Sequence, residues 1–210
     1  MKLVIFGATG RIGGHLVNWG IDAGHDVHAL ARHPEALRPR DGLTVTGGDV
    51  LDPATVAGVI SGADAVLSAL GPRGLDGFRA IELLAPAASN IIDGMHKTGA
   101  HRLIGVSAAG AFVTEDPDMS WLVKQILPRI FARTYADVRR MEQVVRASNL
   151  DWTLVRPTRL VNAPGTGEYR VRADYAPRGG GKIARADVAH FIATALTTAT
   201  YIRQSPVLAY

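Results

Sequence analysis

The chain opens with MKLVIFGATGRIGG (residues 1–14), where a short apolar run leads directly into closely spaced glycines. The almost continuously apolar residues 2–6 are typical of a strand buried on both faces of a parallel sheet. Gly7, Gly10 and Gly13 follow in a G-x-x-G-x-x-G spacing, and a helical pattern begins beside them. Gly7 permits a tight turn, Gly10 lets the backbone approach a ligand closely, and Gly13 lets the helix pack on the strand. The stretch therefore predicts a turn that holds a pyrophosphate at a helix N-terminus.

Strand-like and helix-like segments alternate along the rest of the chain. Strands are expected at residues 2–6, 26–31, 43–46, 65–70, 103–106 and 153–155, with a short final strand after the last helix. Helices are expected at residues 12–23, 80–98, 135–148 and 186–198, with a further short helix that Asp52 and Pro53 open. Helices between strands need crossover connections, which produce a parallel sheet covered on both faces. We therefore predict an α/β fold: a Rossmann-type doubly wound parallel sheet in a single domain over residues 1–210, with about residues 157–210 forming a small C-terminal cap on the substrate side.

Composition excludes several classes of protein. The chain has 210 residues, of which 47% are hydrophobic and 20% charged, as expected for one folded domain. It contains no run of 18 apolar residues and no full signal-peptide core, so we expect a cytoplasmic protein that does not span a membrane. The absence of cysteine excludes disulfides, thiolate metal sites and a cysteine nucleophile, and the seven histidines lack metal-ligand spacing. We therefore expect no metal.

The basic charge balance favours a small anionic ligand over nucleic acid. The formal net charge is +4, and the arginines are spread along the whole chain. No helix-turn-helix pattern, aromatic platform or zinc spacing accompanies them. A basic protein of this kind suits an anionic cofactor.

The end of the second expected strand indicates which dinucleotide binds. Arg32 stands there, and no carboxylate is present to bind a ribose diol. The planar guanidinium suits the 2′-phosphate of NADP(H). Arg11 in the glycine turn is expected to contribute to the same anion site, with Arg38 and Arg40 as weaker candidates. A solvated Arg32, or one that stacks on adenine without selecting, is the alternative.

Six stretches together resemble one known family. The chain is similar to the atypical short-chain dehydrogenase/reductases, in particular to the NAD(P)H-binding, NmrA-like group that includes NAD(P)H-flavin reductases and biliverdin reductase B. The matching stretches cover nearly the whole chain and are residues 7–13, Gly48-Asp49-Val50, Ser68-Ala69-Leu70-Gly71, Val106-Ser107-Ala108, 140–157 and 183–189.

The resemblance implies a cofactor site along the carboxyl ends of the strands, where open α/β sheets bind ligands. Asp49 would accept a hydrogen bond from the adenine amine, Ser107 would meet the nicotinamide ribose, and Pro157-Thr158 would meet the carboxamide. For Ser107, the alternative is a hydroxyl that caps a loop. The full set of expected cofactor residues is Gly7, Thr9, Gly10, Arg11, Ile12, Gly13, Arg32, Asp49, Val50, Leu70, Gly71, Arg73, Ser107, Pro157 and Thr158.

The catalytic pattern departs from the usual one of short-chain dehydrogenases. They use Tyr-x-x-x-Lys, in which the lysine lowers the tyrosine pKa. Here Tyr135 is followed by Arg139 in the lysine position, and the resemblance also places Asp137 and Arg140 near the active-site helix face. Tyr135 and Ser107 are the candidate catalytic residues, with packing or substrate lining as the alternative for Tyr135. Ser107 lacks a G-x-S-x-G elbow, which argues against a hydrolase.

Residues 112–131 form an apolar insertion that Pro128 interrupts. A lid over the substrate, core filling and a dimer contact are all compatible with this pattern.

These features predict an NADPH-dependent reductase that transfers hydride to a small conjugated acceptor such as a flavin or quinone. One alternative is a non-catalytic NADP(H)-sensing protein that binds a partner. Another is a carbonyl reductase or epimerase that uses Tyr135, although the short C-terminal region argues against a nucleotide-sugar pocket. The sequence leaves the oligomeric state open.

Overall fold

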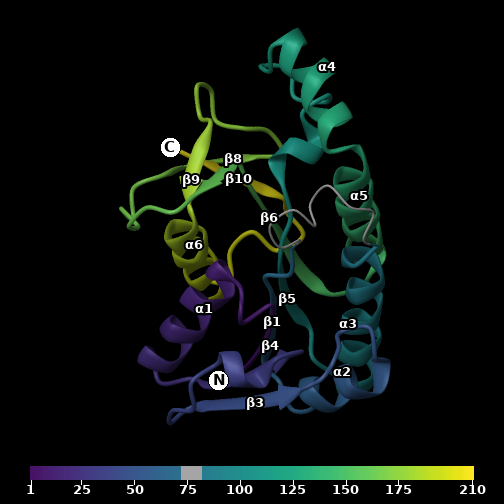
Figure 1. The fold of residues 1–210 in the computed structure, drawn as a ribbon, viewed down its shortest axis with the longest axis vertical. Helices are drawn as coiled ribbons and strands as arrows, with labels where there is room; N and C mark the ends of the chain where they lie inside the picture. Colours follow the sequence, from purple (N-terminus) through teal and green to yellow (C-terminus); the bar gives the residue numbers. More distant parts are fainter. Residues whose placement is uncertain (72–81) are drawn as a thin grey trace.

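A computed structural model describes residues 1–71 and 82–210. Its main element is an eight-stranded sheet in the order β3-β2-β1-β4-β5-β6-β10-β8, with β7 and β9 in a separate parallel pair (Figure 1). Only β8 runs antiparallel to its neighbour in the main sheet as described. The strands are β1 (Lys2–Phe6), β2 (Asp26–Ala31), β3 (Leu43–Gly47), β4 (Ala65–Ser68), β5 (Arg102–Val106), β6 (Asp151–Pro157), β7 (Arg159–Val161), β8 (Arg170–Ala173), β9 (Lys182–Ala184) and β10 (Pro206–Ala209). The predicted doubly wound α/β fold is confirmed.

Helices cover both faces of this sheet. Helices α1 and α6 pack together on one face, and α2, α3 and α5 pack on the other. The helices are α1 (Arg11–Asp22), α2 (Pro53–Ile60), α3 (Leu84–Thr98), α4 (Trp121–Ile130), α5 (Ala132–Ala147) and α6 (Arg185–Thr197), with short 3-10 helices η1 (Pro34–Ala36) and η3 (Ala109–Phe112). No helix in residues 1–71 or 82–210 is long and apolar enough to cross a membrane.

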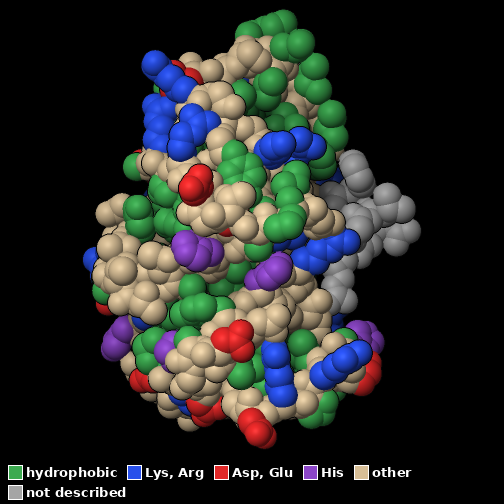
Figure 2. Space-filling model, turned by 90° about the vertical axis from the view of Figure 1, so that its left-hand side faces the viewer, with side chains coloured by type: hydrophobic (Ala, Val, Ile, Leu, Met, Phe, Trp, Pro, Cys, Tyr) green, Lys and Arg blue, Asp and Glu red, His purple; other side chains and the backbone are tan. Residues whose placement is uncertain are grey.

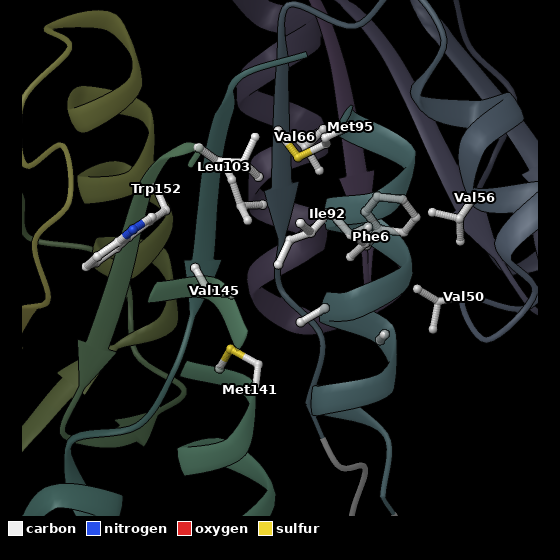
Figure 3. Close-up of a cluster of buried hydrophobic side chains, with 14 of the residues drawn as sticks. Phe6, Val50, Val56, Val66, Ile92, Met95, Leu103, Met141, Val145 and Trp152 are labelled. Atoms are coloured by element: carbon white, nitrogen blue, oxygen red, sulfur yellow. The ribbon is translucent and has the colours of Figure 1, made fainter. Parts of the chain in front are cut away.

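The apolar run of β1 is explained by two separate cores. Val4 and Phe6 belong to the cluster beneath α2, α3 and α5, whereas Leu3 and Ile5 belong to the cluster beneath α1 and α6. Successive side chains of a strand point to opposite faces, so a strand covered on both sides must be apolar throughout. Figure 3 shows the first cluster, in which Phe6 lies among side chains from α3 and neighbouring strands.

Local sequence signals set the ends of two helices. The Asp52 carboxylate accepts the backbone N–H of Ala54 at 3.1 Å, and Pro53 takes the first position of α2. Gly99 ends α3 in the left-handed conformation at φ +78°, which a residue with a Cβ adopts only with strain. Both boundaries agree with the sequence-based expectation.

The C-terminal segment, residues 157–210, contributes two strands to the main sheet. Its predicted helix and final strand are α6 and β10, and β10 pairs in parallel with β6. Strand β8 then extends the sheet beyond β10, and β7 and β9 form the separate pair. The sequence analysis did not predict strands β7, β8 and β9, which are three or four residues long and, in β8, largely exposed.

The apolar insertion forms helix α4, which projects from the body of the molecule (Figures 1 and 2). None of the α4 residues is buried, and its most exposed large side chain is Trp121, at 73%. Core filling is therefore excluded for α4. Pro128 lies within the helix and does not end it.

Candidate functional site

The glycine turn joins β1 to α1 in the predicted order. A Cβ on Gly7, which has φ +80°, would lie 2.6 Å from the carbonyl oxygen of Ala69. A Cβ on Gly13 would lie 2.1 Å from the carbonyl oxygen of Gly7, so Gly13 brings α1 directly against the turn. Gly10 donates its N–H to the Gly7 carbonyl at 2.9 Å. Close backbone contacts thus require glycine at positions 7 and 13.

This turn fits the diphosphate of a dinucleotide. Gly10 is the N-cap of α1 and has no side chain to satisfy the first N–H groups of the helix. The first turn of α1 also contains no acidic residue that would repel an anion. N–H groups and the positive end of the helix dipole therefore point to the place where the phosphates are expected.

The expected adenosine end follows β2, β3 and β4. Arg32 directly follows β2, is exposed, and has no hydrogen-bond or ion-pair partner among the described residues. Asp49 is exposed, and one of its carboxylate oxygens accepts the N–H of Leu51 at 3.0 Å, which leaves the other oxygen to accept a further donor. Val50 is buried, and its carbonyl oxygen is bound by the Asn90 amide at 3.0 Å. These residues present suitable groups at one edge of the sheet.

Three other expectations at this end have different outcomes. Leu70 and Gly71 follow β4, and Leu70 packs partly buried against the core. Arg73 lies outside the described residues. The guanidinium of Arg40, a weaker candidate, is bonded to the side chain of Asn18.

Ser107 follows β5 and is bound to a buried acidic residue that the sequence interpretation did not single out. Its hydroxyl donates to Oε1 of Glu142 at 2.5 Å, and the two residues are 8% and 1% exposed. The Nε and NH2 groups of Arg156 donate to the same carboxylate at 2.9 and 2.6 Å. A buried carboxylate is stable only when it is paired and hydrogen-bonded, and Arg156 with Ser107 supplies those partners.

Further contacts hold this group rigid. The Arg156 guanidinium lies 3.5 Å from the centre of the Phe112 ring, in η3, and also donates to the carbonyl of Asp174 at 3.2 Å. Arg146 contacts the Glu142 carboxylate from one helical turn further along α5, at 3.2 Å. A charged residue within the apolar strand β6 was the signal that could have identified this cluster.

Tyr135 is not arranged like the tyrosine of a Tyr-x-x-x-Lys pair. Its ring packs over Gly110 so closely that a Cβ there would lie 2.2 Å from the hydroxyl oxygen. Burial raises the pKa of Tyr135, whereas an activated catalytic tyrosine needs a lowered one. Arg139 is engaged elsewhere, with Glu115 at 2.6 Å and over the Phe112 ring.

Two neighbours of Tyr135 on α5 have structural partners. The buried Asp137 carboxylate accepts the N–H groups of Leu83, Leu84 and Ala85 at 3.0, 2.8 and 3.2 Å, and so caps the N-terminus of α3. Arg140 pairs with Glu82 at 2.9 Å. The resemblance placed both near the active-site helix face, and the structure gives each a partner at the start of α3.

The expected nicotinamide end lies where β6 stops. Pro157 is the last residue of β6, and Thr158 donates both its N–H and its hydroxyl to the carbonyl of Leu208, at 3.1 and 3.0 Å. Thr158 is therefore left with oxygen acceptors only. If Thr158 contacts the cofactor carboxamide, the carboxamide N–H group would therefore have to donate to an oxygen of Thr158.

Asp187 fixes the loop that precedes β8. Its carboxylate accepts the N–H groups of Thr166 and Gly167 at 2.9 Å each, and the hydroxyl of Tyr210 at 2.5 Å. Burial alone would raise the pKa of Asp187, but these hydrogen bonds hold it below its usual value. The described residues contain no group of histidine, aspartate and glutamate side chains that would hold a metal.

A doubly wound parallel sheet with this glycine turn defines a dinucleotide-binding protein of the Rossmann type. The chain belongs to the NAD(P)H-binding family, which it matches over residues 7–199. The resemblance found in the sequence and the expected class of cofactor are thereby confirmed.

Known relatives agree with this assignment. The chain is 30% identical to an uncharacterized sugar epimerase, YhfK of Bacillus subtilis, over 93% of this chain and 88% of that protein. It also shares the fold of the anaerobilin reductase ChuY of Escherichia coli, with a TM-score of 0.82, 23% identity and coverage of 100% and 97% of the two chains. A short-chain dehydrogenase/reductase of Veillonella parvula in complex with NADP has a TM-score of 0.80, 20% identity and coverage of 100% and 94%.

Proposed function

We propose that the protein is an NADPH-dependent reductase that acts on a small conjugated acceptor such as a flavin or a quinone. The observation that carries this proposal is that neither candidate catalytic side chain among residues 1–71 and 82–210, Ser107 or Tyr135, is an activated proton donor. The Ser107 hydrogen is committed to Glu142, and burial raises the pKa of Tyr135. A conjugated acceptor does not need an enzymatic acid, because water can supply its proton.

The chain's own residues would bind and orient the reactants. The turn at residues 7–13 would hold the diphosphate, Arg32 the 2′-phosphate, and Asp49 the adenine amine. Ser107, with its hydrogen donated to Glu142, would offer its oxygen lone pairs to a donor on the ribose or the carboxamide. Gly71, Pro157 and Thr158 would complete the cofactor contacts along the carboxyl ends of the strands.

Bound NADPH would supply the hydride, so that two electrons and one hydrogen leave the cofactor and a solvent proton completes reduction of the acceptor. Positioning the two flat reactants would then be the main contribution of the protein.

A second candidate is a protein that senses NADP(H) without turnover. The exposed apolar side chains of α4 favour it, because clustered apolar surface often marks a protein-binding site. A carbonyl reductase or epimerase that uses Tyr135 is favoured by the description of YhfK as a sugar epimerase. It is opposed by the raised pKa of Tyr135 and by the pairing of Arg139 with Glu115.

One measurement separates the two kinds of reductase from the sensor. NADPH oxidation is followed with flavins, quinones and aldehydes in parallel, at saturating cofactor. Turnover with flavins or quinones supports the proposal. Turnover with aldehydes alone supports a carbonyl reductase that uses Tyr135. Tight NADPH binding without turnover on any acceptor supports the sensor.

A further inference from the structure

A groove of about 410 Å³ lies beside the N-termini of α1 and α6. Arg11 and His15, one turn apart on α1, form one wall, Arg185 at the start of α6 forms the second, and residues 161–164 form the third. Figure 2 looks onto the side of the molecule that carries these helices, and Lys, Arg and His side chains are visible across it. Among the described residues, the side chains that line the groove include three basic ones and no carboxylate.

The two arginines of the groove have no acidic partner in residues 1–71 and 82–210. Neither Arg11 nor Arg185 forms an ion pair within the part of the chain that the structure describes. Burial lowers the pKa of the Arg185 guanidinium, and the neighbouring positive charge of Arg11 lowers it further. An anion between them would therefore relieve a repulsion that is present without it.

The guanidinium of Arg185 is already oriented. One of its nitrogens donates to the side-chain oxygen of Asn162 at 2.7 Å, which fixes the group while leaving other N–H donors. The nearby carboxylate of Asp187 does not neutralise it through a direct ion pair, because Asp187 is occupied by Thr166, Gly167 and Tyr210.

The groove adjoins the expected diphosphate site and extends beyond it. The diphosphate is expected at the backbone of residues 7–13, which include Arg11, whereas His15 lies a full turn beyond Arg11 along α1 and Arg185 begins α6. Residues 161–164 begin three positions after Thr158, where the nicotinamide is expected. An acceptor that faces the nicotinamide would therefore be able to extend a charged tail toward the groove.

We propose that the groove between Arg11, His15 and Arg185 binds a phosphate group carried by the acceptor, so that phosphorylated acceptors are preferred over neutral ones. Paired arginines are well suited to phosphate, because the guanidinium fork matches its oxygens. The inference rests on the proposed reductase function and specifies its substrate class.

FMN and riboflavin test it, because they share one ring system and differ in a single phosphate. We expect wild type to show a KM for FMN about tenfold below that for riboflavin, which corresponds to one charge-assisted contact. In Arg185→Gln the KM for FMN should rise about tenfold, so that the two flavins have similar KM values. Arg203→Gln is the matched control, because Arg203 is exposed and, where the structure describes the chain, its guanidinium donates a hydrogen bond to the carbonyl of Asn149 and to no other group.

Other results overturn the proposal in recognisable ways. Equal KM values for FMN and riboflavin in wild type would show that the groove does not select phosphate. A weaker affinity of Arg185→Gln for NADPH, with an unchanged FMN-to-riboflavin ratio, would assign the groove to the cofactor.

If wild type reduces neither flavin, the groove is tested with inorganic phosphate alone, and the proposed function fails only if no quinone is reduced either. Thermal stabilisation by phosphate at saturating NADPH, lost in Arg185→Gln but kept in Arg203→Gln, supports an anion site. No stabilisation of wild type overturns it.

Discussion

The Ser107 hydroxyl donates to Oε1 of Glu142 at 2.5 Å, at the end of the strand that is expected to meet the nicotinamide. This direction matters chemically, because a hydroxyl that gives its hydrogen to a carboxylate is left with acceptor lone pairs. Ser107 is therefore suited to orienting a donor and poorly suited to protonating a substrate. Glu142 in turn is held by Arg156.

Glu142 should be important for stability. In Glu142→Gln the buried Arg156 loses its counterion, and breaking a buried pair in this way typically costs about 3–5 kcal/mol. We expect a loss of this size in the free energy of unfolding, measured by urea denaturation. Glu115→Gln is the matched control, since Glu115 forms an exposed pair with Arg139 and should cost at most about 1 kcal/mol. Similar losses in the two variants would contradict the assignment.

Arg32 should determine the choice between NADPH and NADH. Wild type is expected to bind NADPH about ten- to a hundredfold more tightly, because a charge-assisted contact to the 2′-phosphate is worth about 1.5–3 kcal/mol. Arg32→Ala should remove that preference and leave NADH binding unchanged, as fluorescence titration of both cofactors would show. Equal affinities in wild type would rule out the assignment, and Arg203→Ala controls for the general loss of positive charge.

Gly10→Val should abolish binding of both cofactors, because its side chain would occupy the space that the diphosphate needs. The turn lies at the surface, so the variant should still fold, and its melting curve checks this. Gly14→Ala is the control, since a Cβ at Gly14 has no heavy atom closer than 4.0 Å. Micromolar NADPH binding by folded Gly10→Val would show that the glycine serves the turn alone.

Asp187 should make stability depend on pH in the acidic range. Its folded-state pKa is lowered, so the stability it contributes is complete above the ordinary carboxyl value of about 4 and is lost as pH falls through the lower folded value. Wild type should therefore exceed Asp187→Asn in urea midpoint at pH 7, and the difference should shrink below about pH 4. A difference that does not change with pH would contradict an ionised Asp187.

The sequence predicted those parts of the fold that depend on local patterns. Lys2–Phe6 was recognised because both faces of β1 are buried, and Asp52 because its capping position is set by neighbouring residues. Strand β8 was missed, since its pairing with β10 depends on residues more than thirty positions away and its own pattern is largely exposed.

The same distinction applies to the site. The glycine turn is one continuous segment, and its spacing could be read directly. Glu142 and Arg156 act through a contact between α5 and β6, and Asp137 through contacts with α3. Such partners are fixed by tertiary packing, so the resemblance could place Asp137 near the active-site helix face but could not show that its carboxylate caps α3.

Tyr135 should matter little for turnover. Its pKa is raised by burial, and Arg139, in the position of the activating lysine, pairs with Glu115. Tyr135→Phe should therefore lower the maximal rate of NADPH oxidation with the best acceptor by less than about tenfold, whereas removal of a general acid typically costs 10²–10⁴-fold. Ser107→Ala is the companion variant and should also have a modest effect, because the Ser107 hydroxyl is expected to orient the nicotinamide side. A loss of a thousandfold or more in Tyr135→Phe, with folding and NADPH affinity unchanged, would move the protein to the carbonyl-reductase class, because only an acceptor that needs a proton from Tyr135 would depend so strongly on one hydroxyl.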